Sequence, residues 1–194
     1  MARQIEYDPV ALRKNILGVF WQHGFSETSL ADIEAATGLN RRQLYNGPGD
    51  KREMFLQALD DFFEQVGRDF LGKLESDEAG IQDIANLLNR LVGLADGKEG
   101  VSGCLVCSTS QEEIAQDSAV KDRLDAYFDR IKSAYVNTLT RAIARGEIDL
   151  PGDAVEGRSA SLFAVHVALC ILGRAKRPQE ELARMAAQAV ADLR

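Results

Sequence analysis

Apolar residues recur along most of the chain at the spacing of an α-helix, in which positions three, four and seven apart share one face. The pair Asp8-Pro9 is a helix start signal, and the first such face follows it at Leu12, Ile16, Val19 and Phe20. No stretch alternates apolar and polar residues as a strand does. Helices are predicted from Pro9 to Gly24 and at about 29–36, 40–46, 50–74, 81–95, 102–115, 118–145, 153–173 and 178–193. The pattern therefore predicts an all-α fold of about nine helices.

The first three predicted helices are close together, and a tight turn around Gly38 separates the second from the third. Glycine suits this turn because it takes a positive φ at little cost. The arrangement is typical of a helix-turn-helix DNA-binding motif, with Ile33, Leu39 and Leu44 anchoring the third helix. The other face of that helix carries donors for base edges and phosphates, namely Arg41, Arg42, Gln43, Tyr45 and Asn46.

The net charge of −7 disfavours nucleic acid as a partner only if the charge is spread evenly. Residues 1–58 contain seven basic and seven acidic side chains, so the acidic excess lies in the rest of the chain. A locally basic surface is sufficient for DNA binding, and the N-terminal segment is compatible with one. The N-terminus lacks an apolar signal-peptide core, and no uninterrupted apolar run approaches the roughly 20 residues that span a bilayer. We expect a cytoplasmic protein with no membrane partner.

The N-terminal segment resembles a known DNA-binding domain over about residues 10–56. The residues that carry the resemblance, in order and spacing, are Phe20, Gly24, Phe25, Thr28, Ser29, Leu30, Asp32, Ile33, Ala36, Gly38, Leu39, Leu44, Tyr45 and Lys51. They are similar to the N-terminal domain of the tetracycline-repressor (TetR) family. The segment 103–106 and the predicted long helix 118–145 also resemble the C-terminal domain of some members.

The resemblance implies a DNA-binding domain at 1–49 and a ligand-binding and dimerisation domain at 50–194. It implies a repressor that binds double-stranded, palindromic operator DNA as a homodimer and is released by a small-molecule effector. The recognition helix would be 40–46, beginning at Asn40. Tyr45 and Lys51 resemble the family's phosphate contacts, and Thr28 and Ser29 would add contacts at a helix N-terminus, which favours anions.

One position departs from the family pattern. After the tyrosine, members usually carry a polar residue and then a phenylalanine that packs beneath the recognition helix, whereas this chain has Gly47 and Pro48. Either Phe25, Trp21 or Phe55 fills that space, or the domain is more loosely packed than in other members.

Aromatic and apolar residues in the C-terminal half are the candidates for lining an effector cavity. The candidate lining contains few charged residues, so we expect an apolar or aromatic effector. The predicted ligand-binding residues are Phe62, Phe63, Leu88, Tyr127, Phe128, Tyr135, Phe163 and His166. Packing in a filled core is the alternative, which the sequence does not exclude.

The last two predicted helices are apolar on more than one face, which predicts a partner on their outer side. Two such pairs would form a four-helix interface with two-fold symmetry. The predicted interface residues are Leu162, Val165, Leu169, Leu172, Leu182, Met185 and Val190.

The remaining signal is a C-x-x-C motif, Cys104 to Cys107. Such a spacing can form a reversible disulfide, although two thiols packed in a core have the same sequence pattern. A dithiol redox-responsive regulator or redox protein is therefore one alternative function, and a helical dimeric module that has lost operator binding is another. His23 and His166 are isolated, so no metal site is predicted. No catalytic or nucleotide-binding motif is present, so neither an enzyme nor a cofactor is expected.

Overall fold

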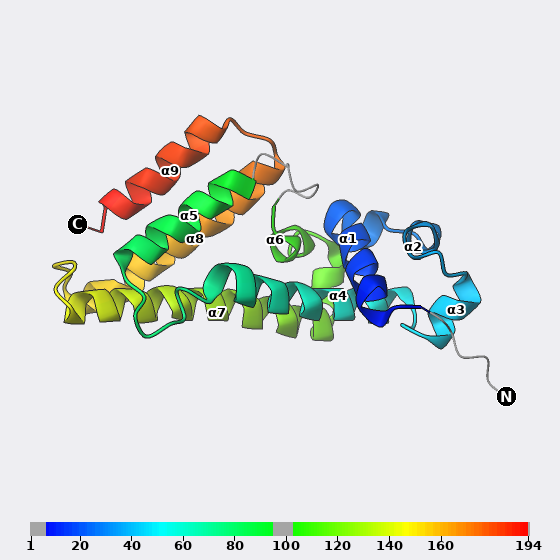
Figure 1. Ribbon diagram of the computed structural model, residues 1–194. Helices are drawn as coiled ribbons and strands as arrows, with labels where there is room; N and C mark the ends of the chain where they lie inside the picture. Colours follow the sequence, from blue (N-terminus) through cyan, green and yellow to red (C-terminus); the bar gives the residue numbers. More distant parts are fainter. Residues whose placement is uncertain (1–6, 95–102, 194) are drawn as a thin grey trace.

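The computed structural model describes residues 7–94 and 103–193, and every regular element in these ranges is helical. The predicted all-α fold with about nine helices is confirmed. Figure 1 shows α1, α2 and α3 at one end of the molecule and the bundle of α5, α7, α8 and α9 at the other, with α4 leading from the first to the second. The α-helices are α1 (Pro9–Glu27), α2 (Leu30–Thr37), α3 (Arg41–Asn46), α4 (Lys51–Val66), α5 (Ile81–Leu94), α6 (Leu105–Thr109), α7 (Ser118–Ala144), α8 (Val155–Arg174) and α9 (Gln179–Ala191).

Helix α1 bends at Gly24, where φ is +78°. Glycine adopts this conformation without steric cost, which is why the sequence predicted the end of the helix here. That prediction was wrong in extent, because a helical turn resumes and runs to Glu27. The carboxylate of Glu112 accepts the backbone N–H groups of Phe25 at 3.1 Å and Ser26 at 2.6 Å, and so holds the turn that follows the bend.

The starts of α2, α3 and α4 are each fixed by a capping box, in which two side chains accept one another's backbone N–H groups. The three pairs are Ser29 with Asp32, Asn40 with Gln43, and Asp50 with Glu53. A cap of this kind stabilises a helix by about 1 kcal/mol. Between α2 and α3, Gly38 has φ +72° and closes the turn, as predicted.

Helix α4 is shorter than the predicted helix 50–74. It ends at Val66 and continues as a π-helical turn, Gly67–Leu71. Two glycines, Gly67 and Gly72, lower the helix propensity here. The guanidinium of Arg130 also lies where a Cβ at position 67 would stand, 2.6 Å from its Nη2 atom. A larger residue at this position would displace the Arg130 guanidinium.

The predicted helix 102–115 is divided into α6 and a 3₁₀ turn, Glu113–Gln116. The hydroxyls of Ser108, Thr109 and Ser110 all donate to backbone carbonyls of the preceding turn. Such side chains compete with the helical hydrogen bonds and favour an early end. Residue 102 and the end of the predicted helix 81–95 lie outside the described residues.

Helix α8 packs against α5, α7 and α9 in the C-terminal bundle (Figure 1). The stretch 152–174 is long and apolar enough to cross a membrane by length and composition alone, and a core helix of a bundle meets the same criterion. Only 33% of its apolar window is buried within the chain, so much of this helix remains available to a partner.

Candidate functional site

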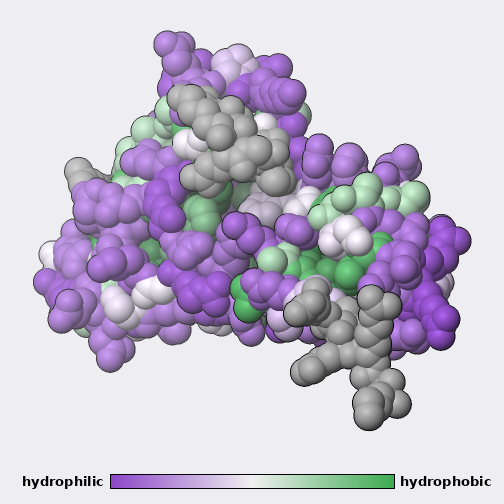
Figure 2. All heavy atoms as spheres, turned by 45° about the vertical axis from the view of Figure 1, so that its right-hand side comes forward, coloured by the Kyte–Doolittle hydropathy of each residue, from purple (hydrophilic) through white to green (hydrophobic). Residues whose placement is uncertain are grey.

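Helix α3 combines one buried anchor with an exposed polar face. Leu44 is fully buried, while Arg41, Arg42, Tyr45 and Asn46 are exposed. Tyr45 is 53% exposed, so most of its ring and its hydroxyl are accessible to a partner. On the face shown in Figure 2, hydrophilic side chains likewise cover the outer edge of the N-terminal helices, with apolar residues visible further in.

Asn40 and Gln43 are already engaged in capping α3. Each side-chain oxygen accepts a backbone N–H of the other residue at 3.0 Å. Pairing of an amide side chain with both edge atoms of adenine needs its oxygen as well as its nitrogen. In this conformation one acceptor site of each amide oxygen is already used, while both NH₂ groups remain available to a partner.

The two predicted contacts at the start of α2 differ in accessibility. The hydroxyl of Thr28 is buried and donates to the carbonyl of Gly24 at 2.6 Å, so it does not face a partner. Ser29 is exposed, although its hydroxyl donates to Asp32 at 2.6 Å. Hydrogen bonds from the Ser29 side chain and backbone lower the pKa of Asp32. Of the two residues, only Ser29 remains a candidate for contacting a DNA phosphate.

Lys51 is held beside an aromatic pair at the start of α4. Its Nζ lies 4.3 Å from the centroid of the Phe25 ring, and that ring packs 4.9 Å from the ring of Phe55. Of the three aromatic residues expected near the recognition helix, these two pack together here. Trp21 instead contacts Phe62 in α4, with ring centroids 5.0 Å apart.

The structure explains why position 47 is a glycine. The hydroxyl of Tyr7 lies 2.8 Å from the point that a Cβ at position 47 would occupy. A larger residue at this position would displace the tyrosine or the end of α3.

A cavity of about 910 Å³ lies between α1, α4 and the C-terminal helices. Three of the eight predicted ligand-binding residues line it: Phe62, Tyr127 and His166. His166 is buried, and its Nδ1 lies 3.1 Å from the hydroxyl of Tyr135. Burial lowers the pKa of His166 to about 4, so the imidazole is neutral at neutral pH.

The other five predicted residues do not line this cavity. Leu88 and Tyr135 are fully buried in the core. Phe63, Phe128 and Phe163 belong to a chain of ring contacts through Tyr127, in which Phe128 and Phe163 are 5.6 Å apart. They are packing residues of the α4–α7–α8 contact rather than cavity walls.

The sequence did not identify several cavity residues. Trp21 was assigned to the DNA-binding half, and Leu169 to the dimer interface, yet both line the cavity. Three charged residues, Lys14, Asp69 and Arg90, line it too, so the wall is less apolar than expected. The guanidinium of Arg90 stacks on the Phe70 ring at 4.3 Å. No periodicity marks these residues, because they come from separate helices.

A family model described as the tetracyclin repressor-like C-terminal domain matches residues 80–190, which is more than half of the chain. The chain belongs to the TetR family. It is accordingly a DNA-binding transcriptional regulator and not an enzyme.

Similar proteins agree with TetR membership. The chain is 25% identical over 149 residues to YezE of Bacillus subtilis (strain 168), an HTH-type transcriptional regulator, with 77% of each chain covered. It is 24% identical over 143 residues to the HTH-type transcriptional repressor ComR of Escherichia coli (strain K12), covering 73% of this chain and 68% of ComR. A cysteine mutant of the TetR-family regulator CifR, solved with a 26-bp double-stranded operator DNA, has the same fold, with a TM-score of 0.88, 24% identity and 100% of both chains covered.

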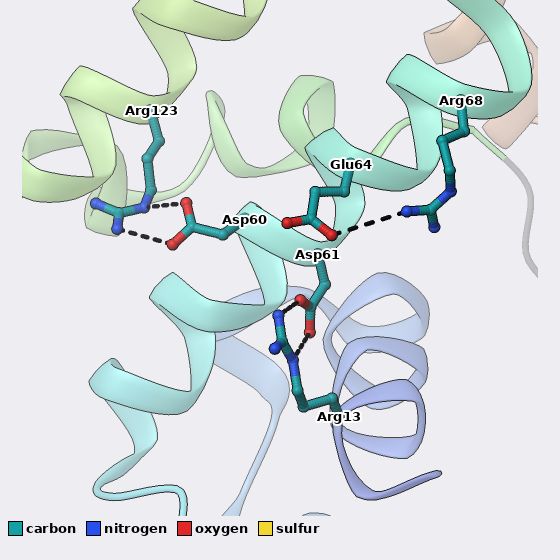
Figure 3. Close-up of polar contacts among 6 residues, drawn as sticks. All are labelled: Arg13, Asp60, Asp61, Glu64, Arg68 and Arg123. Atoms are coloured by element: carbon teal, nitrogen blue, oxygen red, sulfur yellow. Dashed lines mark hydrogen bonds and ion pairs between the residues drawn. The ribbon is translucent and has the colours of Figure 1, made fainter. Parts of the chain in front are cut away.

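In this TetR-family chain, α4 is held by ion pairs on two sides (Figure 3). Asp61 accepts Arg13 of α1, and the adjacent Asp60 accepts two hydrogen bonds of 2.8 and 2.9 Å from Arg123 of α7. Exposed pairs of this kind each contribute about 0–1 kcal/mol to stability. Their main effect is to fix the position of α4 relative to α1 and α7. They tie one helix to both halves of the molecule.

Another contact lies closer to the DNA-binding end of α4. Arg52 donates two hydrogen bonds of 2.8 Å to Asp117, the N-cap of α7. The hydrogen bonds from Arg52 are the main reason that the pKa of Asp117 is lowered to about 2. The first turn of α4 is thus fixed to the start of α7.

The predicted dimer residues fall into two groups. Leu162, Leu169 and Leu182 are fully buried within a single chain and do not face a partner. The others are partly buried: Val165, Leu172, Met185 and Val190. The outer face of α8 instead carries Ala160, Ala164 and Ile171, all exposed, at positions that share one side of the helix.

Proposed function

We propose that this TetR-family regulator is a repressor that binds a palindromic operator as a homodimer and leaves it when a small molecule occupies the central cavity. The observation that carries this proposal is that α1, which packs against α2, and α4, which directly follows the recognition helix α3, also form walls of a cavity of about 910 Å³. A molecule in that cavity contacts both of these helices directly. Similarity to relatives named as repressors supports the same direction of control.

Operator recognition would rest on α3 and on the start of α4. Arg41 and Arg42 are the exposed candidates for guanine edges, since Arg pairs with guanine through two hydrogen bonds. Tyr45, Lys51 and Ser29 would contact phosphates, which fix register but carry no sequence information.

Operator binding is tested with labelled DNA from upstream of the protein's own coding sequence. Arg42→Ala is expected to weaken binding by about 1–3 kcal/mol and to relax preference at one base position. Lys51→Ala is expected to weaken binding to all sequences alike and to reduce the salt slope by about one unit. Lys121→Ala, an exposed lysine of α7, is the matched control. Unchanged binding in both test variants would place the DNA contacts on other residues, whereas no binding by the unsubstituted protein would favour the alternative of a helical module without operator binding.

The effector would have an apolar or aromatic body and a polar end. Trp21, Phe62 and Leu169 offer contacts for the body, whereas Lys14, Asp69 and Arg90 offer partners for a polar group. Trp21 is the one tryptophan of the chain, so its fluorescence reports on the cavity wall. A bound effector is expected to change that emission and to lower operator affinity at the same concentrations.

The homodimer would form through the outer faces of α8 and α9. These faces carry small exposed residues, including Ala164 in α8 and Ala183 and Ala187 in α9, which permit close helix packing. Two-fold symmetry would then place the recognition helices on half-sites about 34–36 Å apart, or a multiple of that. Ala164→Glu is expected to give monomer in sedimentation, while Ser133→Glu, at an exposed site in α7, stays dimeric. A dimer in both variants would place the interface elsewhere.

A further inference from the structure

All three cysteines of the chain lie together, although the sequence linked only two of them. Cys104 immediately precedes α6, Cys107 lies within α6, and Cys170 lies in α8. Each of the three residues is buried, and all three line one hollow. The hydroxyl oxygen of Tyr127 lies 3.4 Å from the sulfur of Cys104.

The thiols are shielded from bulk solvent but border two hollows. Cys104 and Cys170 line the cavity of about 910 Å³. All three line a second hollow of about 500 Å³, on whose other side lie His23 and Ser26 of α1. Cys104 lines both hollows, so a small solute in either one lies next to this residue.

The cluster favours one ionised thiol and two protonated ones. Burial alone would raise the pKa of Cys104, but hydrogen bonds from Cys107, Cys170 and Tyr127 outweigh burial and lower it well below the ordinary value. The hydrogen bonds to Cys104 raise the pKa of Cys107 and of Cys170. The hydroxyl of Tyr127, 3.4 Å from the sulfur of Cys104, can donate to an ionised thiol at this position, which makes Cys104 the candidate nucleophile of the cluster.

Polar contacts connect the cluster to α1 on three sides. The carbonyl of Gly103, next to Cys104, accepts the indole N–H of Trp21 at 3.1 Å. Arg174, one helical turn after Cys170, donates to the carbonyls of Trp21 and Gln22, both at 3.1 Å. Glu112 holds the N–H groups that follow the bend at Gly24. A displacement of α6 or of the end of α8 is therefore passed to the helix that carries the DNA-binding domain.

We propose that Cys104, Cys107 and Cys170 form an oxidant-sensing site, in which a hydroperoxide converts Cys104 and one neighbour into a disulfide that weakens operator binding. The Cys104 thiolate attacks one oxygen of hydrogen peroxide, the O–O bond breaks, and the hydroxide released takes a proton to become water. The resulting sulfenic acid is attacked by the neighbouring thiol, forming the S–S bond and releasing a second water. Two thiols are oxidised by two electrons in total, and one peroxide is reduced to two waters.

The disulfide would change the geometry of the junction. Its sulfurs must approach to about 2.05 Å, closer than two thiols in hydrogen-bond contact. This approach draws the segment of Gly103 and Cys104 toward its partner and strains the contacts with Trp21 and Gln22. The regulatory part of the inference rests on the proposed operator binding, whereas the disulfide chemistry does not.

The chemistry is tested on the reduced full-length protein treated with hydrogen peroxide. Free thiols are counted after denaturation, and disulfides are located by mass spectrometry of peptides. We expect loss of two of the three thiols, with Cys104 in every disulfide found. Survival of all three thiols, or a Cys107–Cys170 disulfide that leaves Cys104 free, overturns the proposal.

The role of Cys104 is tested separately by alkylation with iodoacetamide at neutral pH, which needs no cysteine substitution. Cys104 is expected to react first. Tyr127→Phe removes a donor to the thiolate and is expected to slow this reaction about tenfold or more. Tyr135→Phe is the matched control, because Tyr135 is equally buried but bonds His166 instead. Equal rates in both variants, or first reaction at another cysteine, contradict the assignment.

The regulatory step is measured as binding to the upstream DNA before and after oxidation. Oxidation is expected to lower affinity about tenfold, within the usual range of coupling between sites, and dithiothreitol is expected to restore it. Cys104→Ala is expected to bind equally in both conditions. A disulfide without any change in affinity overturns the regulatory step. Failure of the reduced protein to bind DNA instead contradicts the proposed function and leaves the chemistry standing.

Discussion

The indole nitrogen of Trp21 donates a hydrogen bond of 3.1 Å to the carbonyl oxygen of Gly103. The donor belongs to α1, which packs against the DNA-binding helices, and the acceptor belongs to the segment that leads into α6. Both residues also line the central cavity. The bond therefore joins the DNA-binding half to the cavity wall at a point where either an effector or a disulfide would act.

Trp21→Phe is expected to reduce the free energy of unfolding by about 1–2 kcal/mol, because the partly buried Gly103 carbonyl loses its donor. It is also expected to reduce the effect of oxidation on operator affinity. Phe62→Leu is the control, since it removes the ring that packs on Trp21 but keeps the hydrogen bond. Urea unfolding followed by circular dichroism and DNA titration give the two readouts. An equal loss of response in both variants would assign the effect to ring packing.

The bend at Gly24 yields a second prediction, which compares two glycines with positive φ. A Cβ at Gly24 would lie 2.7 Å from the Glu112 carboxylate, whereas a Cβ at Gly38 would meet nothing within 4 Å. Gly38→Ala should therefore lower the free energy of unfolding only by the strain of an alanine in the left-handed conformation, about 1–2 kcal/mol. Gly24→Ala should cost more, because ψ is −179° at Gly24, a backbone region that is essentially confined to glycine, and because its Cβ would meet Glu112. Glu112→Ala in the same chain should recover the part that is due to the contact. Thermal unfolding of the three variants measures this, and no recovery in the double variant would show that the Glu112 contact is unimportant.

The helices of this protein could be predicted from sequence because their signals are local. The face of Leu12 and Ile16, the turn at Gly38 and the caps at Ser29 and Asn40 each act within a few residues. One error arose where a distant residue packs against the helix end. Arg130 closes over Gly67 where α4 ends, a contact between residues far apart in the sequence.

The sites were harder to predict for the same reason. Phe62 and Phe63 are adjacent in α4 and equally apolar, yet only Phe62 lines the cavity. Trp21 and Cys170 join Cys104 from opposite ends of the chain, and no periodicity connects them. A sequence pattern tells which face of a helix is buried, but not whether a cavity or another side chain lies against it.

Burial of His166 predicts a specific dependence of stability on pH. Its pKa is lowered to about 4 in the folded protein, whereas an unfolded histidine has a pKa of about 6.5. Between these values the unfolded chain binds the proton more readily, so stability falls as the pH drops from about 6.5 to 4. The full loss is about 3 kcal/mol. His166→Asn, which can keep a hydrogen bond to Tyr135, should lack this component. Parallel pH slopes of the two unfolding free energies would show that the pKa of His166 is the same in the folded and unfolded chain.

The last prediction follows from thermodynamic linkage between the disulfide and the operator. If oxidation lowers operator affinity, the operator must favour the reduced thiols by the same factor. The midpoint potential of the Cys104 disulfide is therefore expected to become more positive when operator is bound, by about 30 mV for each tenfold change in affinity per disulfide. Equilibration in glutathione redox buffers, with and without operator, measures the two potentials, and DNA of scrambled sequence serves as the control. Equal potentials would mean that the disulfide leaves the operator complex undisturbed, even if Cys104 is oxidised readily. A shift with scrambled DNA as large as that with operator would assign the coupling to general electrostatic attraction rather than to the position of the recognition helices.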